Sequence, residues 1–198
     1  MLQFDRDHRS LFAHGFAQGP AQGEIGAKAE QSPSPTRNPA QPVSTVLVQV
    51  DKTGKVTPIH ITSARLNYAD LERKVFLDGG VTAKEEDATM TGEQMTVYLL
   101  PRSQSKGGAN PARPGQVDRI IAENKVEITQ PKRHATGERL VYTSVDDRFV
   151  LTGGPPSIFD AEQGKTTGDS LTFYRRDDRV LVDGRETSPA VTRTQVAR

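Results

Sequence analysis

The sequence predicts an all-β protein in which short strands stack as a repeat, and two patterns carry this prediction. A phrase of strand, polar turn, strand and corner occurs four times, most clearly over 136–142 and 148–154. The corner residues of the four copies are Gly79, Asn124, Gly153 and Gly184. Once the long interval 102–116 is set aside, their spacing gives a period of roughly thirty residues, which is typical of repeat architectures.

The second pattern is the alternation of apolar and polar residues inside each copy. A period of two indicates strands, because successive strand side chains point to opposite faces. Each corner is Gly or Asn, the residues that adopt a left-handed backbone most easily. Equivalent positions of stacked repeats lie above one another, so the apolar positions should form continuous inward-facing stripes. These positions are Leu66, Tyr68, Val75, Leu77, Met95, Val97, Ile120, Ala122, Val126, Leu140, Tyr142, Phe149, Leu151, Leu171, Phe173, Val180 and Val182.

The composition sets limits on both size and chemistry. A chain of 198 residues suits one all-β domain with a tail. Its apolar fraction of 34% is below the roughly 45–50% of an average domain, which fits a thin β-structure. The net charge of +1 gives no reason to expect nucleic-acid binding. The absence of cysteine excludes disulfides and thiol catalysis, and no apolar run is long enough for a membrane-spanning helix.

The N-terminal part of the chain carries no repeat. Residues 1–42 are rich in proline near their end, which predicts a disordered leader and linker with at most a weak helix over 8–17. The start also lacks the apolar region of a signal peptide. The ordered domain should cover 43–187 and open with a strand, and the proline at position 58 is tolerated only at a sheet edge or a break. The first strands should therefore form the N-terminal edge of the stack.

The repeat governs the chain from Val75 to Gly184. We expect roughly ten to fourteen short strands between about 45 and 187, with no substantial helix. The interval 102–116 is too long for a turn of this repeat and is expected to be a loop. Residues 188–198 are polar and are expected to form a flexible tail.

No residue pattern indicates catalysis, a metal site or a cofactor. The four histidines, at positions 8, 14, 60 and 134, have no carboxylate at metal-ligand spacing, and no nucleotide or nucleophile motif occurs. The pairs Asp146–Asp147 and Asp177–Asp178 resemble paired acids, but both fall in turns of equivalent copies. Aspartate is favoured in turns because it hydrogen-bonds to the turn backbone, so we expect these residues to have a structural role.

A row of basic residues is the remaining candidate site. Lys74, Arg119, Arg148 and Arg179 each precede a corner by the same interval, so they should stand side by side across the sheet. The row is either a ladder of surface charges, of small energetic weight, or a set of phosphate contacts for a ligand. We favour the surface ladder.

The repeated Thr-Gly-acidic-x-Leu-x-Tyr strand with its glycine corner resembles the OstA-like domain of lipopolysaccharide transport proteins, in the LptA, LptC and LptD N-terminal types. The resemblance covers about 45–187. It implies a twisted, half-open β-jellyroll in the periplasm of a Gram-negative cell. It also implies an apolar groove for the acyl chains of lipopolysaccharide, lined by thirteen of these inward-facing residues: Leu66, Tyr68, Leu77, Met95, Val97, Val126, Leu140, Tyr142, Phe149, Leu151, Leu171, Phe173 and Val182. End-to-end pairing through edge strands, with other OstA-like proteins or with a second copy, is a further implication.

Two other functions remain open on the sequence. The chain could be a purely structural repeat or an adhesin module, or, less in keeping with four copies, a β-helix enzyme acting on polysaccharide through Asp147 and Asp178. An open groove would favour the lipid carrier, and a close-packed interior would favour the structural module. The expected edge strands, 46–50 and 181–184, contain no proline, so we predict that they pair with a partner.

Overall fold

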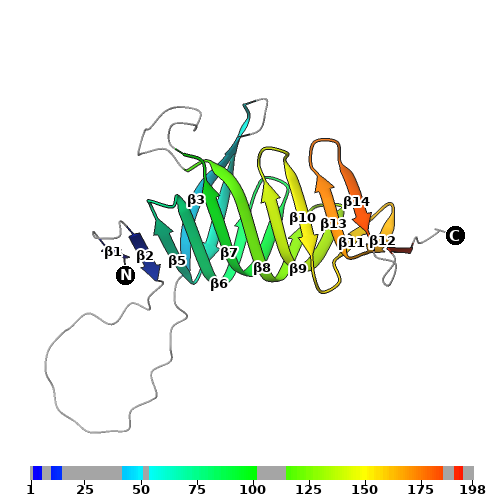
Figure 1. Ribbon diagram of the computed structural model, residues 1–198, viewed down its shortest axis with the longest axis horizontal. Helices are drawn as coiled ribbons and strands as arrows, with labels where there is room; N and C mark the ends of the chain where they lie inside the picture. The colour runs from blue at the N-terminus through cyan, green and yellow to red at the C-terminus, as the bar shows by residue number, and fades with distance from the viewer. Residues whose placement is uncertain are drawn as a thin grey trace, which may run out of the picture.

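In the computed structural model, the described residues are 2–5, 10–14, 42–50, 54–101, 115–184 and 190–193. They contain fifteen β-strands and no helix, which confirms the predicted all-β class. Twelve of the strands, β3 to β14, lie between Val43 and Asp183, within the predicted number. All fifteen belong to one antiparallel sheet, and Figure 1 shows them side by side along the long axis of the molecule.

The strands are β1 (Leu2–Asp5), β2 (Ser10–His14), β3 (Val43–Val50), β4 (Val56–Ser63), β5 (Arg65–Ala69), β6 (Lys74–Lys84), β7 (Thr89–Leu99), β8 (Val117–Thr129), β9 (Arg133–Thr143), β10 (Arg148–Thr152), β11 (Ser157–Asp160), β12 (Gly164–Thr167), β13 (Ser170–Tyr174), β14 (Arg179–Asp183) and β15 (Val191–Arg193).

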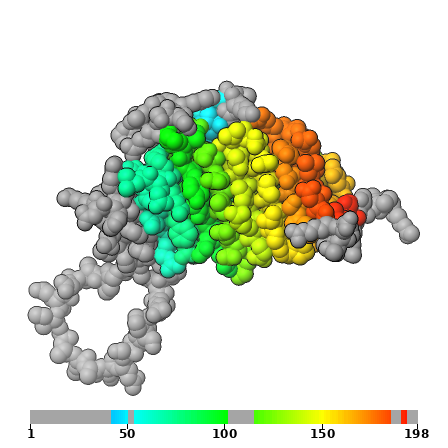
Figure 2. All heavy atoms as spheres, viewed as in Figure 1, coloured from blue at the N-terminus to red at the C-terminus, as the bar shows by residue number. Residues whose placement is uncertain are grey.

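The sheet folds over into two layers because its four longest strands, β6 to β9, belong to both. The first layer runs β1-β2-β5-β6-β7-β8-β9-β10-β13-β14. The second layer consists of β3, β4, the other halves of β6 to β9, and then β11, β12 and β15. Pairing shifts register where the long strands cross between layers, as between Asp78 and Val81. The space-filling view shows the successive strands following one another along the stack without a break (Figure 2).

Three of the four predicted corners mark crossings between the layers, and the fourth, Gly184, directly follows β14, where residues 185–189 lie outside the described part of the chain. Gly79, Asn124 and Gly153 have positive φ angles of 86°, 64° and 78°, the left-handed backbone that Gly and Asn tolerate best. Because consecutive strands run antiparallel, all corners lie along one edge of the molecule and all turns along the opposite edge. We call this second edge the rim. The turns at the rim are 70–73, 144–147 and 175–178 in the first layer, and 85–88, 130–132 and 161–163 in the second.

The core lies between the layers and contains the predicted stripes. Nine of the thirteen residues that we expected to line a groove are buried: Leu66, Leu77, Met95, Val97, Val126, Leu140, Tyr142, Leu151 and Leu171. The other four, Tyr68, Phe149, Phe173 and Val182, are half-buried. The inward orientation predicted from the alternation is therefore confirmed. The core also contains residues that lie outside the repeated segments: Leu47, Ile59, Ile61, Val81, Met90, Leu99 and Val117.

The N-terminal segment differs from the prediction, because it contains strands where a disordered leader or a weak helix was expected. Strands β1 and β2 form a hairpin, and β2 pairs antiparallel with β5 over Arg65–Ala69. Without β2, this edge of β5 would carry unpaired backbone N–H and C=O groups, and an added strand satisfies them whatever its periodicity. The expected linker over 15–41 lies outside the described residues.

The C-terminal segment differs in the same way, since β15 lies within the expected flexible tail. It pairs with β12 through Val191, Thr192 and Arg193 and so extends the second layer by one strand. Of the loop expected over 102–116, residues 102–114 lie outside the described residues.

Both predicted edge strands stand at ends of the stack. Among the described residues, β14 pairs with β13 alone, which leaves its other side unpaired. Strand β3 pairs with β4, and its free side meets only an isolated bridge in which the Val48 N–H donates to the Gly115 carbonyl at 3.0 Å. Pro58 lies in the part of β4 that pairs with β3 alone, as expected for a proline at an edge.

Candidate functional site: an apolar interior closed at the rim

The interior between the layers is mostly filled by its own side chains. A cavity of about 50 Å³ remains beneath the rim, which is room for a few water molecules and not for an acyl chain. Its lining includes the apolar residues Ile59, Met90, Ile120, Tyr142, Phe149 and Phe173 and the polar residues Gln49, Glu85 and Arg175. An open groove was expected for a lipid carrier and a close-packed interior for a structural module. The packing seen here favours a structural module unless the two layers can separate.

Polar side chains join the two layers above this cavity. The Arg175 guanidinium contacts Glu85 at 2.9 Å and donates to the Gln49 side-chain carbonyl at 3.4 Å. The Gln49 amide donates to Asp147 at 3.2 Å, and the Tyr142 hydroxyl donates to the same carboxylate oxygen at 3.2 Å. We call these five residues, Gln49, Glu85, Tyr142, Asp147 and Arg175, the rim network.

Two hydrogen-bond donors of the rim network, Arg175 and Tyr142, are kept protonated by their surroundings. Burial works against the charged form of Arg175, but the hydrogen bond and charge of Glu85, together with the charge of Asp147, raise its pKa overall. For Tyr142, in contrast, burial itself raises the pKa of the hydroxyl, and the Asp147 carboxylate raises it further. Because the Glu85 side chain is only 10% exposed, this carboxylate depends on Arg175 to offset its loss of hydration.

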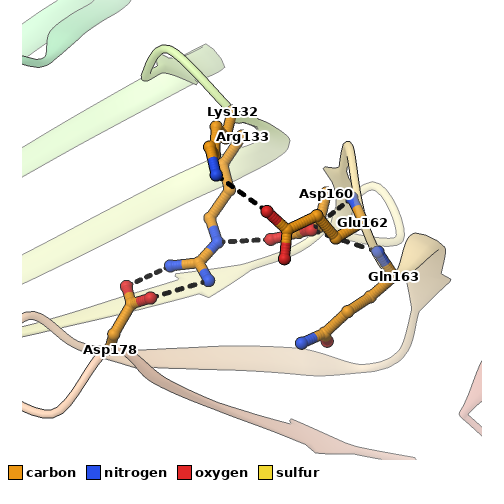
Figure 3. A network of polar contacts seen from close by, with 6 residues as sticks. All are labelled: Lys132, Arg133, Asp160, Glu162, Gln163 and Asp178. Atoms are coloured by element: carbon orange, nitrogen blue, oxygen red, sulfur yellow. Dashed lines mark hydrogen bonds and ion pairs between the residues drawn. The ribbon is translucent and has the colours of Figure 1, made fainter.

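A second contact between the layers lies further along the rim, where Arg133 of β9 reaches the turn 175–178 (Figure 3). Its guanidinium pairs with Asp178 of the first layer, at 2.9 Å for one of the two hydrogen bonds, and with Asp160 of the second layer at 2.6 Å. It also lies 5.6 Å from the ring centre of Phe173, which favours a cation–π contact. We call this the Arg133 bridge.

Acid should weaken the Arg133 bridge. Hydrogen bonds from Arg133 and from the Glu162 backbone N–H lower the pKa of Asp160 in the folded protein. As the pH falls, the Asp160 carboxylate is therefore protonated at a higher pH in the unfolded chain, where its pKa is about 3.9, than in the folded protein. The stabilisation is complete above that pH and is lost as the pH falls through the folded-state pKa. We expect the urea midpoint to fall more steeply below about pH 5 in the parent than in Asp160→Asn.

The control for this pH experiment is Asp87→Asn, in the exposed turn between β6 and β7. That variant should show the pH profile of the parent. Equal profiles for the parent and Asp160→Asn would contradict the assignment of the acid-sensitive contact to Asp160.

The basic row forms as predicted on the outer face of the first layer. Its cross-strand neighbours in register are Lys74, Tyr98, Arg119, Thr143, Arg148, Tyr174 and Arg179. Several of these cations already have partners within the protein. Arg119 stacks on Tyr98 at 4.7 Å and Arg179 on Tyr174 at 4.6 Å, while Lys74, Arg148 and Arg179 lie 3.6–3.9 Å from carboxylates of adjacent turns. These contacts favour a surface ladder, and a role in phosphate binding stays a prediction.

The aspartates weighed as catalytic acids have structural contacts. Asp147 belongs to the rim network and Asp178 to the Arg133 bridge. Both have positive φ angles, 49° and 54°, which aspartate tolerates better than most residues in a tight turn. In the part of the chain that the structure describes, no three His, Cys, Asp or Glu side chains are placed to hold a metal ion.

Sequence reasoning missed five residues of these rim contacts: Gln49, Glu85, Arg133, Asp160 and Arg175. The contacts Gln49–Asp147 and Arg175–Gln49 join residues that are 98 and 126 positions apart. The only signal in the sequence is that four of these residues, Glu85, Arg133, Asp160 and Arg175, lie in or beside polar turns. That signal does not tell which turns face each other.

The fold defines the class of protein: an open, twisted β-jellyroll whose apolar interior lies between two layers. Residues 60–179 match the family described as LptA/(LptD N-terminal domain) LPS transport protein. The chain belongs to this family, as the repeated strands and corners predicted.

Two individual proteins illustrate the relationship. An uncharacterized protein of Rhizobium meliloti (strain 1021), R00383, is 30% identical over 96 residues, which are 48% of this chain and 50% of that protein. The chain therefore spans about half the length of this curated relative. The crystal structure of LptH, the LptA homologous periplasmic component of the lipopolysaccharide transport device from Pseudomonas aeruginosa, superposes with a TM-score of 0.52. It is 14% identical, and the match covers 70% of this chain and 91% of LptH, so it supports the fold. Within the described residues, no helix is long and apolar enough to cross a membrane.

Proposed function

We propose that this chain is a periplasmic lipopolysaccharide transport protein that holds acyl chains between its two layers, without catalysis. The observation that carries the proposal is the continuous apolar interior, from Leu66 at one end to Val182 at the other, in a protein of the lipopolysaccharide transport family. The match to LptH supports the same fold. In the same proposal, the basic row on the outer face of the first layer contacts phosphates of the lipid.

The energetics suit a carrier that passes its ligand along a matched path. Burying one methylene contributes about 0.8 kcal/mol, so a chain of roughly a dozen carbons gains on the order of 10 kcal/mol. A protein that released such a chain into water would lose all of this stabilisation. Transfer between equivalent apolar interiors avoids that cost and requires no catalytic group.

The interior must widen to admit an acyl chain. The strands cross between the layers at the corners, whereas the rim is held by side-chain contacts such as Arg175–Glu85 and Arg133–Asp178 and by the backbone hydrogen bond from Val48 to Gly115. Separation at the rim leaves the backbone ladder of each layer intact. Opening there is therefore the movement with the smallest loss of hydrogen bonds.

Photo-crosslinking tests the proposed interior site. A photoreactive amino acid at Phe149, which is half-buried and lines the cavity, should form an adduct with lipopolysaccharide in cells and with purified protein. The matched control is Val150, the next residue along β10, which points to the outer face. Equal adducts at both positions, or none at Phe149, would contradict the proposal.

Partner binding is proposed to use the free strand edge of β14. The backbone groups on its outer side have no strand partner among the described residues, and such an edge can pair with a strand of another chain. Leu181 in this strand is 43% exposed. Pairing of unlike ends gives open, concentration-dependent chains and not a closed dimer. At the other end, the β1–β2 hairpin already occupies the edge of β5.

Leu181→Lys should weaken end-to-end association, because a charge on an edge strand opposes pairing with another strand. Sedimentation velocity over a wide concentration range should show a smaller average mass for this variant than for the parent. The control is Val145→Lys, at a 62% exposed position in a rim turn. If both variants associate like the parent, the β14 edge is not the contact.

A second candidate function is a purely structural module, which the packed interior favours. A structural module would form no interior adduct with lipopolysaccharide and would tolerate permanent closure of the rim. The photo-crosslinking experiment at Phe149 therefore separates the two functions.

A further inference from the structure

The mouth of the cavity lies where the two rows of turns face each other. Gln49 and Glu85 belong to the second layer, whereas Asp147 and Arg175 lie in turns of the first layer. All contacts of the rim network except Tyr142–Asp147 therefore join one layer to the other. Directly beneath them the cavity is lined mainly by apolar side chains. A chain that reaches the cavity from the side has to pass between these polar residues.

The rim network is poised to open because it is incompletely satisfied. The Glu85 Oε1 atom is buried and has no hydrogen-bond partner among the described residues. A partly satisfied buried polar group costs free energy in the closed state. Arg175 is 30% exposed, so water can replace its partners when the layers separate. These two features lower the free-energy difference between the closed and open rim.

We propose that the rim network is a gate through which a single acyl chain enters the interior sideways, and that the Arg175–Glu85 pair holds this gate closed. The inference rests on the proposed function and adds the route and the controlling residues. The competing route is axial, from the end formed by β14, where Phe173 and Val182 are only half-buried. A covalent lock at the rim closes the lateral route and leaves the axial route free.

The chain has no cysteine, so two introduced cysteines can be cross-linked without reaction at any other thiol. The pair Glu85→Cys and Arg175→Cys is joined by a short bis-maleimide, and uptake of dansyl-undecanoic acid is followed by its fluorescence. Without the cross-linker, the salt bridge is absent, and uptake should be about tenfold faster than in the parent. A factor of about ten is the change expected when opening no longer breaks one hydrogen bond between charged groups. With the cross-linker, uptake should fall at least about tenfold below the parent.

The matched control is a second salt bridge that lies within one layer. Lys132 and Glu162 are 2.7 Å apart, with side chains 73% and 71% exposed, and both belong to turns of the second layer. The pair Lys132→Cys and Glu162→Cys, cross-linked in the same way, should leave the uptake rate at that of the parent.

A second set of variants avoids cysteine and reports on function and not only on folding. Arg175→Gln should speed up uptake of the same probe, whereas exchanging the charges, with Glu85→Arg and Arg175→Glu together, should return the rate towards that of the parent. A residue with a purely structural role would lower the unfolding temperature without faster uptake, and that result would overturn the inference.

The outcomes separate this inference from the proposed function. If the locked protein takes up the probe at the parent rate and still forms the lipopolysaccharide adduct at Phe149, the gate is wrong and entry is axial. If the parent itself forms no adduct at Phe149, the proposed function fails and the inference fails with it. Loss of uptake on locking, with the control pair unaffected, supports the gate.

Discussion

Leu140→Ala is expected to lower the free energy of unfolding by about 2–5 kcal/mol, the range for leucine truncation in a packed core. Leu140 is fully buried, and its strand β9 lies between β8 and β10 in the first layer. Removing three carbons leaves a cavity that two hydrogen-bonded neighbours prevent from collapsing. Urea unfolding followed by far-ultraviolet circular dichroism measures the effect.

The matched control makes the same substitution at an exposed position. Leu71 lies in a rim turn and is 74% exposed, so Leu71→Ala should change the free energy of unfolding by no more than about 0.5 kcal/mol. Similar losses for the two variants would contradict the assignment of Leu140 to the core.

Gly79→Ala is expected to destabilise the protein by roughly 2–4 kcal/mol, combining backbone strain with overpacking. Its φ of 86° is unfavourable for any residue with a Cβ atom. A Cβ built at this position also lies 2.7 Å from the Cβ of Ala64, so one of the two segments has to move. Thermal unfolding of the variant should show a lower midpoint than that of the parent.

The neighbouring glycine separates these two costs. Gly80 has a similar φ of 80°, but a Cβ there meets nothing within 4 Å. Gly80→Ala should therefore report backbone strain alone, of about 1–3 kcal/mol. The difference between the two variants measures the close approach to Ala64, and a larger loss at Gly80 than at Gly79 would contradict this account of the corner.

If the gate operates as proposed, stability and transport place opposite demands on the rim. Stronger contacts between the layers protect the apolar interior from water, while weaker ones let the ligand enter. The Arg175–Glu85 pair meets both demands, since this partly buried ion pair joins the layers in the closed state and both of its charges can be hydrated when the layers separate. A close-packed apolar rim would have no comparable alternative partners.

Local sequence patterns were sufficient to predict the strands of the repeat, three of its corners and the inward faces. These features follow from local rules: alternation fixes which face of a strand is apolar, as at Leu140 and Tyr142, and the backbone at Gly79 or Asn124 needs a residue that tolerates positive φ. The basic row was also predictable, because residues at the same distance from successive corners come into register across the sheet.

How the two layers meet could be seen only in the folded protein. The contacts of Arg175 with Glu85 and Gln49 depend on which turns face each other across the interior, and no local pattern encodes a contact over 126 residues. The packed interior, the β1–β2 hairpin on β5 and the docking of β15 on β12 were likewise beyond the sequence. Packing depends on the spacing between the layers, and an unpaired strand edge accepts any backbone that reaches it, because its hydrogen bonds are made by main-chain atoms that every residue carries.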